Sequence, residues 1–161
     1  MMDEIKYKPI GVVRSRFKEP CGVPIQSAVA KGINGTVEVF AEFVEGLKDI
    51  GGFSHIILLC GFQQTKCFSL TVKPFVDNKQ RGVFATRAPS RPNPIGLSVV
   101  RLLSVEDSML NISDVDIVDG TPVLDIKPYI VDFDVRNPEK MGWFDARAHK
   151  IENMKDDGRF V

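Results

Sequence analysis

The sequence is poor in the residues that build disulfide frameworks and metal sites. Among its 161 residues are three cysteines, with no Cys-x-x-Cys pair, and two histidines, at positions 55 and 149. Such a composition excludes a disulfide-stapled scaffold and offers no zinc-binding spacing. We therefore expect reduced thiols and no bound metal.

Long apolar runs are also missing. The longest, Ile56–Cys60, is far below the roughly 20 residues that cross a bilayer, and Met1–Glu4 carries acids where a signal peptide carries positive charge. We expect no membrane segment and a cytoplasmic location. With 21 basic and 21 acidic residues, the chain is neither a globally basic scaffold nor a disordered acidic tail.

Nucleotide-binding signatures are absent as well. The sequence contains no Gly-x-Gly-x-x-Gly, no phosphate-loop Gly-Lys-Ser/Thr and no repeated rhythm of a strand followed by a long helix. A doubly wound nucleotide-binding fold is therefore not expected.

The sequence is rich instead in apolar residues at every second position, which is typical of strands with one buried face. Glu106–Ser108 separates two such runs as a hairpin turn, and Ile56–Leu59 has no polar face, which predicts a strand covered on both sides. A short helix is expected at Glu42–Ile50, before two glycines. The predicted strands are Lys8–Arg14, Gly35–Val39, Phe53–Phe62, Ser69–Val72, Gly82–Thr86, Val99–Val105, Leu110–Ser113 and Val123–Ile126.

Short strands with frequent turns predict a mainly β fold, a single-domain antiparallel β-barrel with short helices. Beyond Pro128 the pattern weakens, and we place the barrel domain at residues 1–135. Residues 136–161 form an irregular, charged C-terminal segment. We expect it to pack on the barrel or on a partner subunit, with Trp143 and Phe144 as its anchor.

Three prolines between Thr86 and Leu97 predict a stiff loop, because each fixes its own φ and extends the residue before it. Arg87 and Arg91 on such a loop suit bidentate binding of a carboxylate or phosphate. A rigid crossover whose arginines pair with nearby acids explains the same residues equally well.

Asp119–Pro122 marks a second candidate site. Asp-Gly indicates a turn, and Pro122 makes it wider than a two-residue hairpin. Either the segment is only a turn, or its carboxylate, hydroxyl and backbone groups hold a ribose, an amine or a base edge. Asp125 and Lys127 follow, and an ion pair between them is the simpler interpretation.

Basic residues mark a candidate nucleic-acid surface, beginning with an irregular loop that also carries one aromatic residue. The candidates for phosphate contacts are Arg14, Arg16, Lys18, Arg91 and Lys127. The stretch from Lys79 to Arg101 is basic with no acid, and either it meets an anion such as a phosphate backbone or it is a solvated face whose charges pair with the acid-rich stretch at 106–119. His55 is more simply a half-buried structural histidine than a catalyst.

Several segments, in this order, resemble the TrmO-like family, also called TsaA-like or YaeB-like. The match runs from about Lys8 to Tyr129, and its two later motifs are long and specific. The matching segments are Ile10–Ser15, Phe53–Ile56, Gly82–Arg87, Arg91–Ser98 and Asp119–Tyr129.

The resemblance implies a homodimeric β-barrel methyltransferase that uses S-adenosylmethionine without a Rossmann fold. The implied substrate is tRNA, in which the exocyclic N6 of threonylcarbamoyladenosine next to the anticodon receives the methyl group. The implied cofactor-binding residues are Gln26, Ser27, Ala28, Phe62, Gln63, Arg87, Leu97, Asp119, Gly120, Thr121 and Pro122.

Two departures from the family pattern leave other functions open. Pro24–Ala28 stands where the family usually has Pro-Arg-Gln-Pro-Gly, so a cation is missing, and Gln63 replaces a common histidine. These changes motivate an S-adenosylmethionine-binding or RNA-binding module without turnover. The zero net charge motivates a methyltransferase with a different substrate.

The leading hypothesis is methyl transfer in which the protein mainly aligns the reactants, because a sulfonium is already a potent electrophile. Arg87 would bind an anionic part of a ligand, and Asp119 would orient the amine or the adenine edge. No general base is assigned, and the candidates are Asp119 and Asp125.

Overall fold

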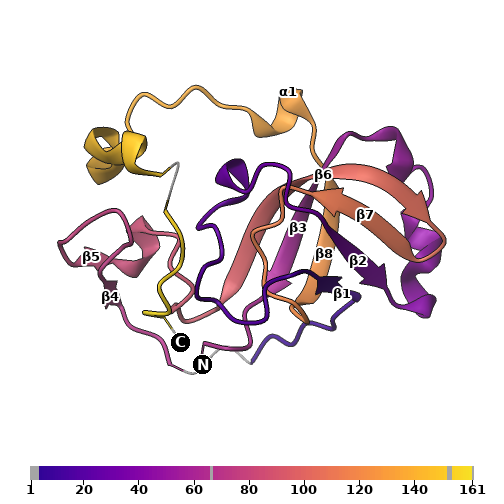
Figure 1. Cartoon of the computed structure of the whole chain (residues 1–161), viewed down its shortest axis with the longest axis horizontal. Helices are drawn as coiled ribbons and strands as arrows, with labels where there is room; N and C mark the ends of the chain where they lie inside the picture. The colour runs from indigo at the N-terminus through magenta and orange to yellow at the C-terminus, as the bar shows by residue number, and fades with distance from the viewer. Residues whose placement is uncertain (1–3, 66, 152–153, 161) are drawn as a thin grey trace.

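Six antiparallel strands close into a barrel in the order β1-β2-β7-β6-β3-β8 (Figure 1). The computed structural model describes residues 4–65, 67–151 and 154–160. The barrel strands are β1 (Gly11–Arg14), β2 (Gly35–Val39), β3 (His55–Gly61), β6 (Ile95–Glu106), β7 (Met109–Ser113) and β8 (Pro122–Pro128). The mainly β barrel expected from the alternation is confirmed.

The long strand β6 organises the barrel. Its first half, Ile95–Arg101, pairs with β3, and its second half, Arg101–Glu106, pairs with β7. Only Asp107 and Ser108 join β6 to β7, and Asp107 has a φ of 52°, the left-handed backbone that tight hairpins require. The predicted hairpin is confirmed. Strand β8 completes the ring by pairing with both β1 and β3.

Branched aliphatic side chains fill the barrel interior. Along β3, Ile56, Leu58 and Cys60 are buried, whereas Ile57 and Leu59 are only partly covered. The expectation that this strand is covered on both sides therefore holds for one face only. The buried cluster comprises Val13, Val37, Val39, Ile50, Ile56, Leu58, Cys60, Val100, Leu102, Leu110, Ile112, Val115, Ile117 and Val123.

A smaller unit, which we call the lobe, lies beside the barrel (Figure 1, left). It consists of residues 70–88, with the two-residue strands β4 (Thr71–Val72) and β5 (Arg81–Gly82), together with residues 154–160. Among the described residues, its buried cluster comprises Val72, Val83 and Ala88, with Phe160 packed against them.

Two predicted elements are wrong. Of the predicted strand Gly82–Thr86, only Gly82 belongs to a strand, β5, and Val83–Ala85 forms a 3-10 turn. The cause is Thr86, whose backbone N–H and hydroxyl both donate to the Val83 carbonyl, at 3.0 and 2.8 Å. The predicted helix Glu42–Ile50 is split into two 3-10 turns, Ala41–Leu47 and Ile50–Gly52, because Asp49 adopts a φ of 66°.

The C-terminal part is mostly irregular. It contains the short helix α1 (Val131–Asp134) and the 3-10 segment Gly142–Lys150. Elsewhere in the chain, the 3-10 turn Ser27–Val29 precedes β2. The Trp143 indole N–H donates to the Ala85 carbonyl at 2.8 Å. A domain boundary at residue 135 stays a prediction. None of the helices in the described part of the chain combines the length and the apolarity needed to cross a membrane.

Candidate functional site

A cavity of about 300 Å³ lies between the barrel and the lobe, where β3 ends and β6 begins. Its lining is largely apolar, with the charged residues Arg87, Arg91, Asp116 and Asp156 among it. This combination of apolar walls and a few charged groups is typical of small-molecule sites. The lining comes from parts of the segments 20–26, 62–65, 87–98 and 116–121 and from Phe75, Asp156 and Phe160.

Both arginines of the proline-rich loop reach this cavity. The Arg87 guanidinium donates to the Gln26 side-chain oxygen at 2.5 Å, across 61 residues of sequence. Arg91 donates to the Thr86 carbonyl at 3.3 Å. Among the described residues, neither arginine forms an ion pair with an acid. The alternative that these arginines pair with nearby acids in a rigid crossover is therefore wrong.

Asp116 lines the cavity, although no sequence pattern marked it as a site residue. Its carboxylate accepts a hydrogen bond from the Ser98 hydroxyl of β6 at 2.7 Å. Burial raises the pKa of Asp116 to about 6, opposed by that hydrogen bond, by the Ser27 backbone amide and by the charge of Arg87. Its neighbours Val115 and Ile117 are almost fully buried. These two apolar neighbours were the sequence feature that could have indicated that Asp116 is enclosed.

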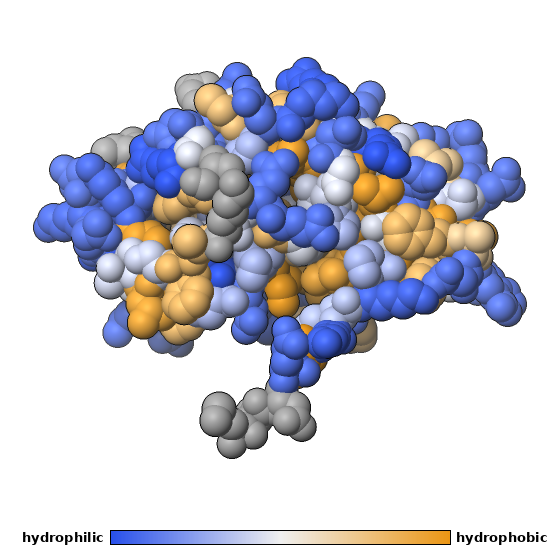
Figure 2. Space-filling view, turned by 90° about the horizontal axis from the view of Figure 1, so that it is seen from below, coloured by the Kyte–Doolittle hydropathy of each residue, from blue (hydrophilic) through white to orange (hydrophobic). Residues whose placement is uncertain are grey.

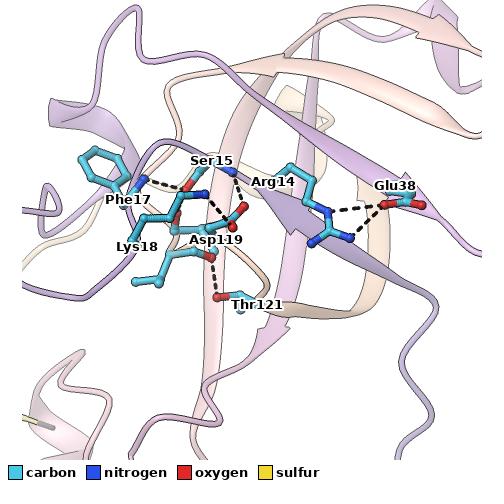
Figure 3. A network of polar contacts seen from close by, with 9 residues as sticks. Arg14, Ser15, Phe17, Lys18, Glu38, Asp119 and Thr121 are labelled. Carbon is cyan, nitrogen blue, oxygen red and sulfur yellow. Dashed lines mark hydrogen bonds and ion pairs between the residues drawn. The ribbon is translucent and has the colours of Figure 1, made fainter.

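The Asp119–Pro122 turn is held by a polar network (Figure 3). Asp119 accepts hydrogen bonds from the Ser15 backbone N–H at 3.0 Å and from the Lys18 ammonium at 2.8 Å. The Lys18 contact, with the Ser15 amide, holds the pKa of Asp119 below its ordinary value. The Thr121 hydroxyl donates to the Val118 carbonyl at 2.7 Å, and Gly120 has a φ of 76°. The turn therefore uses its own carboxylate as a structural acceptor.

A second, more open hollow of about 560 Å³ adjoins the first. Gln63 lines both, and the turn separates them, because Thr121 faces the cavity while Gly120 and Pro122 face the hollow. The remaining lining is Lys8, Pro9, Gly11, Val12, Phe40 and Glu42, and Lys8 forms an ion pair with Glu42.

The structure brings together some of the residues that the family resemblance implies. Those that line the cavity are Gln26, Phe62, Gln63, Arg87, Leu97 and Thr121. Ser27 and Ala28 lie in the adjacent 3-10 turn, Gly120 and Pro122 line the second hollow, and Asp119 lines neither of the two. Their individual roles in binding stay predictions.

Most of the candidate phosphate contacts already have partners within the chain. Lys18 pairs with Asp119 as above, and Arg16 lies over the Phe17 ring at 5.1 Å. Arg14 pairs with Glu38 at 3.2 Å, and Lys127 pairs with Asp125 at 2.7 Å. These pairs are exposed and therefore weak, so they compete little with a phosphate. Asp125 lies outside both the cavity and the hollow.

The C-terminal segment, which was expected only to pack on the barrel or on a partner subunit, contributes Asp156 and Phe160 to a wall of the cavity. The backbones of Gly22 and Val23 exchange hydrogen bonds with Asp156 at 2.7 and 2.8 Å. The Phe160 ring packs edge-on against Phe75, with centroids 5.1 Å apart. Burial raises the pKa of Asp156.

The known proteins that this chain resembles are named as tRNA methyltransferases or S-adenosylmethionine-binding proteins. Residues 12–135 match the family model of the tRNA-methyltransferase O N-terminal domain. A probable S-adenosyl-L-methionine-binding protein of Pyrococcus abyssi is 58% identical over 156 residues, or 97% of this chain and 85% of that protein. The tRNA (adenine(37)-N6)-methyltransferase of Escherichia coli is 41% identical over 139 residues, or 80% of this chain and 59% of that enzyme.

Solved structures share the fold. The crystal structure of TrmO from Pseudomonas aeruginosa has a TM-score of 0.73 at 40% identity, covering 88% of this chain and 63% of that one. Another crystal structure of TrmO has a TM-score of 0.74 at 42% identity, covering 87% and 64%. The chain thus spans less than two thirds of these methyltransferases. The barrel, the ordered motifs and the match over residues 12–135 together show that this chain belongs to the tRNA-methyltransferase O family.

Proposed function

We propose that this protein is an S-adenosylmethionine-dependent methyltransferase that acts on the exocyclic N6 of threonylcarbamoyladenosine next to the anticodon of tRNA. One observation carries the proposal. Gln26, Arg87 and Thr121, which are distant in sequence, line one cavity, and a second hollow adjoins it at Gln63. Two neighbouring hollows suit a reaction between a cofactor and a separate acceptor.

The residues present fit S-adenosylmethionine by size and charge. The Arg87 guanidinium would bind the carboxylate of the methionine part, and the apolar surfaces of Phe62 and Leu97 would hold the adenine ring. When bound, the cofactor supplies a methyl group already activated by a positively charged sulfur.

The protein's own part is mainly alignment. Gln63 and the Asp119–Pro122 turn border both hollows and would fix the distance between the acceptor nitrogen and the methyl group. Asp119 is a poor general base, because its pKa is lowered and its carboxylate is engaged by Lys18 and Ser15. An anticodon loop presents its bases with little unstacking, which favours such a substrate.

We also propose that the protein works as a homodimer in the cytoplasm. Large apolar side chains lie on the surface at Phe84 (77% exposed), Phe133 (68%) and Val131 (65%). On the face in Figure 2, apolar surface gathers over the lobe and across the middle of the molecule, within a largely hydrophilic rim. Such exposed apolar surface is typical of an interface between proteins. Sedimentation equilibrium tests the homodimer directly, and a monomer at all protein concentrations would contradict it.

The central test is a methylation assay. Purified protein is incubated with labelled S-adenosylmethionine and with tRNA that either carries or lacks the threonylcarbamoyl group, and the digested nucleosides are identified. We expect label in the modified adenosine only. Label in protein or small molecules would show a different substrate, and the absence of any labelled product would contradict the proposed enzyme.

A binding module without turnover is the second candidate. The Pyrococcus abyssi relative is described as a probable S-adenosyl-L-methionine-binding protein, and Gln63 stands where a histidine is common in the family. Calorimetry that detects cofactor binding, combined with no methylated nucleoside from either tRNA, would favour this module.

A further inference from the structure

We propose that the Asp116 carboxylate holds the positive charge of the methyl donor's sulfonium and so makes the cavity prefer S-adenosylmethionine over its demethylated product. The inference rests on the proposed cofactor site and assigns a further binding residue within it. Asp116 lines the cavity and contacts the Ser98 hydroxyl at 2.7 Å.

The first reason is that this carboxylate has no cation in contact. Among the described residues, no ion pair within 4.0 Å involves Asp116, and Arg87 acts on it only through space. Its hydrogen bond comes from the neutral Ser98 hydroxyl, and the backbone amides of Asp116 itself and of Ser27, also neutral, favour its charged form. An enclosed carboxylate without an ion-pair partner is unfavourable, and a cationic ligand supplies what the site lacks.

The groups that face Asp116 leave its charge available near neutral pH. Strand β3 contributes the Cys60 thiol, whose pKa burial raises to about 12, so it stays protonated. Strand β6 contributes Ser98, and the proline-rich loop contributes Arg87, which is always charged. Arg91 and Asp156 line the same cavity. Asp116, with a pKa of about 6, is therefore mostly ionised at pH 7.

Hydrogen-bonding capacity points to the sulfonium rather than to the ligand's ammonium. The ammonium has three N–H donors and is joined to the same carbon as the carboxylate that we assign to Arg87. A sulfonium has no donor and is attracted by charge alone, which suits a carboxylate that already accepts a hydrogen bond from Ser98 and lies near the Ser27 amide. After transfer the sulfur is neutral, so the same carboxylate no longer favours the product, and release is eased.

Calorimetry with two ligands tests the assignment. For the Asp116→Asn variant we expect affinity for S-adenosylmethionine to fall about tenfold, while affinity for S-adenosylhomocysteine changes less than about twofold. Asp156→Asn is the matched control, because it removes the other cavity carboxylate, and we expect no such selectivity. Equal losses for both ligands would overturn the proposal, because they would place Asp116 against a group that the two share.

The pH dependence gives a second readout. Affinity of the wild-type protein for S-adenosylmethionine should fall about threefold between about pH 7.5 and about pH 5.5, as Asp116 gains a proton, and affinity for S-adenosylhomocysteine should stay level. Ser98→Ala removes a hydrogen bond that lowers the Asp116 pKa, so the midpoint should move to higher pH. Identical pH profiles for the two ligands would contradict the proposal.

The outcomes also separate this inference from the proposed function. If the wild-type protein binds neither ligand, both fail. If it binds both ligands and the Asp116→Asn variant shows no selectivity, the cofactor site stands and only the role of Asp116 is overturned. Retained binding of S-adenosylhomocysteine in that variant shows that it has folded.

Discussion

The barrel and the lobe are stabilised by different means. In the barrel, every strand pairs with a neighbour on both sides, and the enclosed aliphatic side chains form a single cluster. In the lobe, β4 and β5 share only two residue pairs, and Phe160 from the end of the chain completes a cluster of three buried residues. We therefore expect the lobe wall of the cavity between them to open at a lower free energy than the barrel wall.

The largest expected effect contrasts the two cores. Leu58→Ala in the barrel should lower the free energy of unfolding by about 3 kcal/mol, because it leaves a cavity among fully buried neighbours. Val83→Ala in the lobe removes two methyl groups from a small cluster and should lower it by about 1.5 kcal/mol. Urea denaturation measures both, and equal losses would show that the two cores are equally tight.

Arg87→Ala tests the wall formed by the proline-rich loop. We expect affinity for S-adenosylmethionine to weaken by about 1–2 kcal/mol, because a charged hydrogen-bonding partner is lost, with the fold intact. Arg101→Ala is the control, since Arg101 is exposed on β6 outside the cavity. Unchanged affinity by calorimetry would remove Arg87 from the site.

Phe160→Ala tests how far the C-terminal residues hold the lobe closed. Loss of the ring that packs against Phe75 should lower the free energy of lobe opening by about 1 kcal/mol. Hydrogen exchange should then quicken about fivefold in residues 70–88 and stay unchanged in β3 and β6. A uniform change across both regions would mean that they open as one unit.

Gly96→Ala perturbs the cavity from the barrel side. A β-carbon at Gly96 would overlap the Phe62 ring, which lines the cavity, so the ring must move. We expect cofactor affinity to fall about fivefold with less than about 1 kcal/mol of lost stability, because a side chain and not the backbone gives way. Gly61→Ala is the control, since its β-carbon meets only ordinary contacts at 3.7–3.8 Å. Equal affinities for the two variants would contradict the role of the ring.

The smallest effect concerns the Asp119 turn. Because the Asp119 pKa is lower in the folded protein, its stabilising contribution is present above about pH 4 and is lost as pH falls through the folded pKa. Lys18→Ala should therefore cost about 0.5 kcal/mol at neutral pH and nothing in strong acid, as the pair is exposed. Lys31→Ala is the control, because Lys31 is also an exposed lysine. A pH-independent loss measured by urea denaturation would show that Lys18 acts through packing instead.

The sequence by itself determined the local elements of this protein. Apolar residues at alternate positions specify the barrel strands, since successive side chains of a strand point to opposite faces. The Glu106–Ser108 turn was also readable, because a hairpin needs a residue such as Asp107 that tolerates left-handed backbone. The ordered motifs identified the family directly.

Only the tertiary structure decided which side chains share the site. Asp119 was a site candidate from the sequence, yet its carboxylate accepts hydrogen bonds from Lys18 and Ser15. Asp116, three residues earlier, lines the cavity and accepts a hydrogen bond from Ser98. No sequence pattern indicated that residues 154–160 would form backbone hydrogen bonds with the segment 20–24. Strand order, barrel closure and tail docking depend on contacts between residues far apart in the chain, and a local pattern carries no information about them.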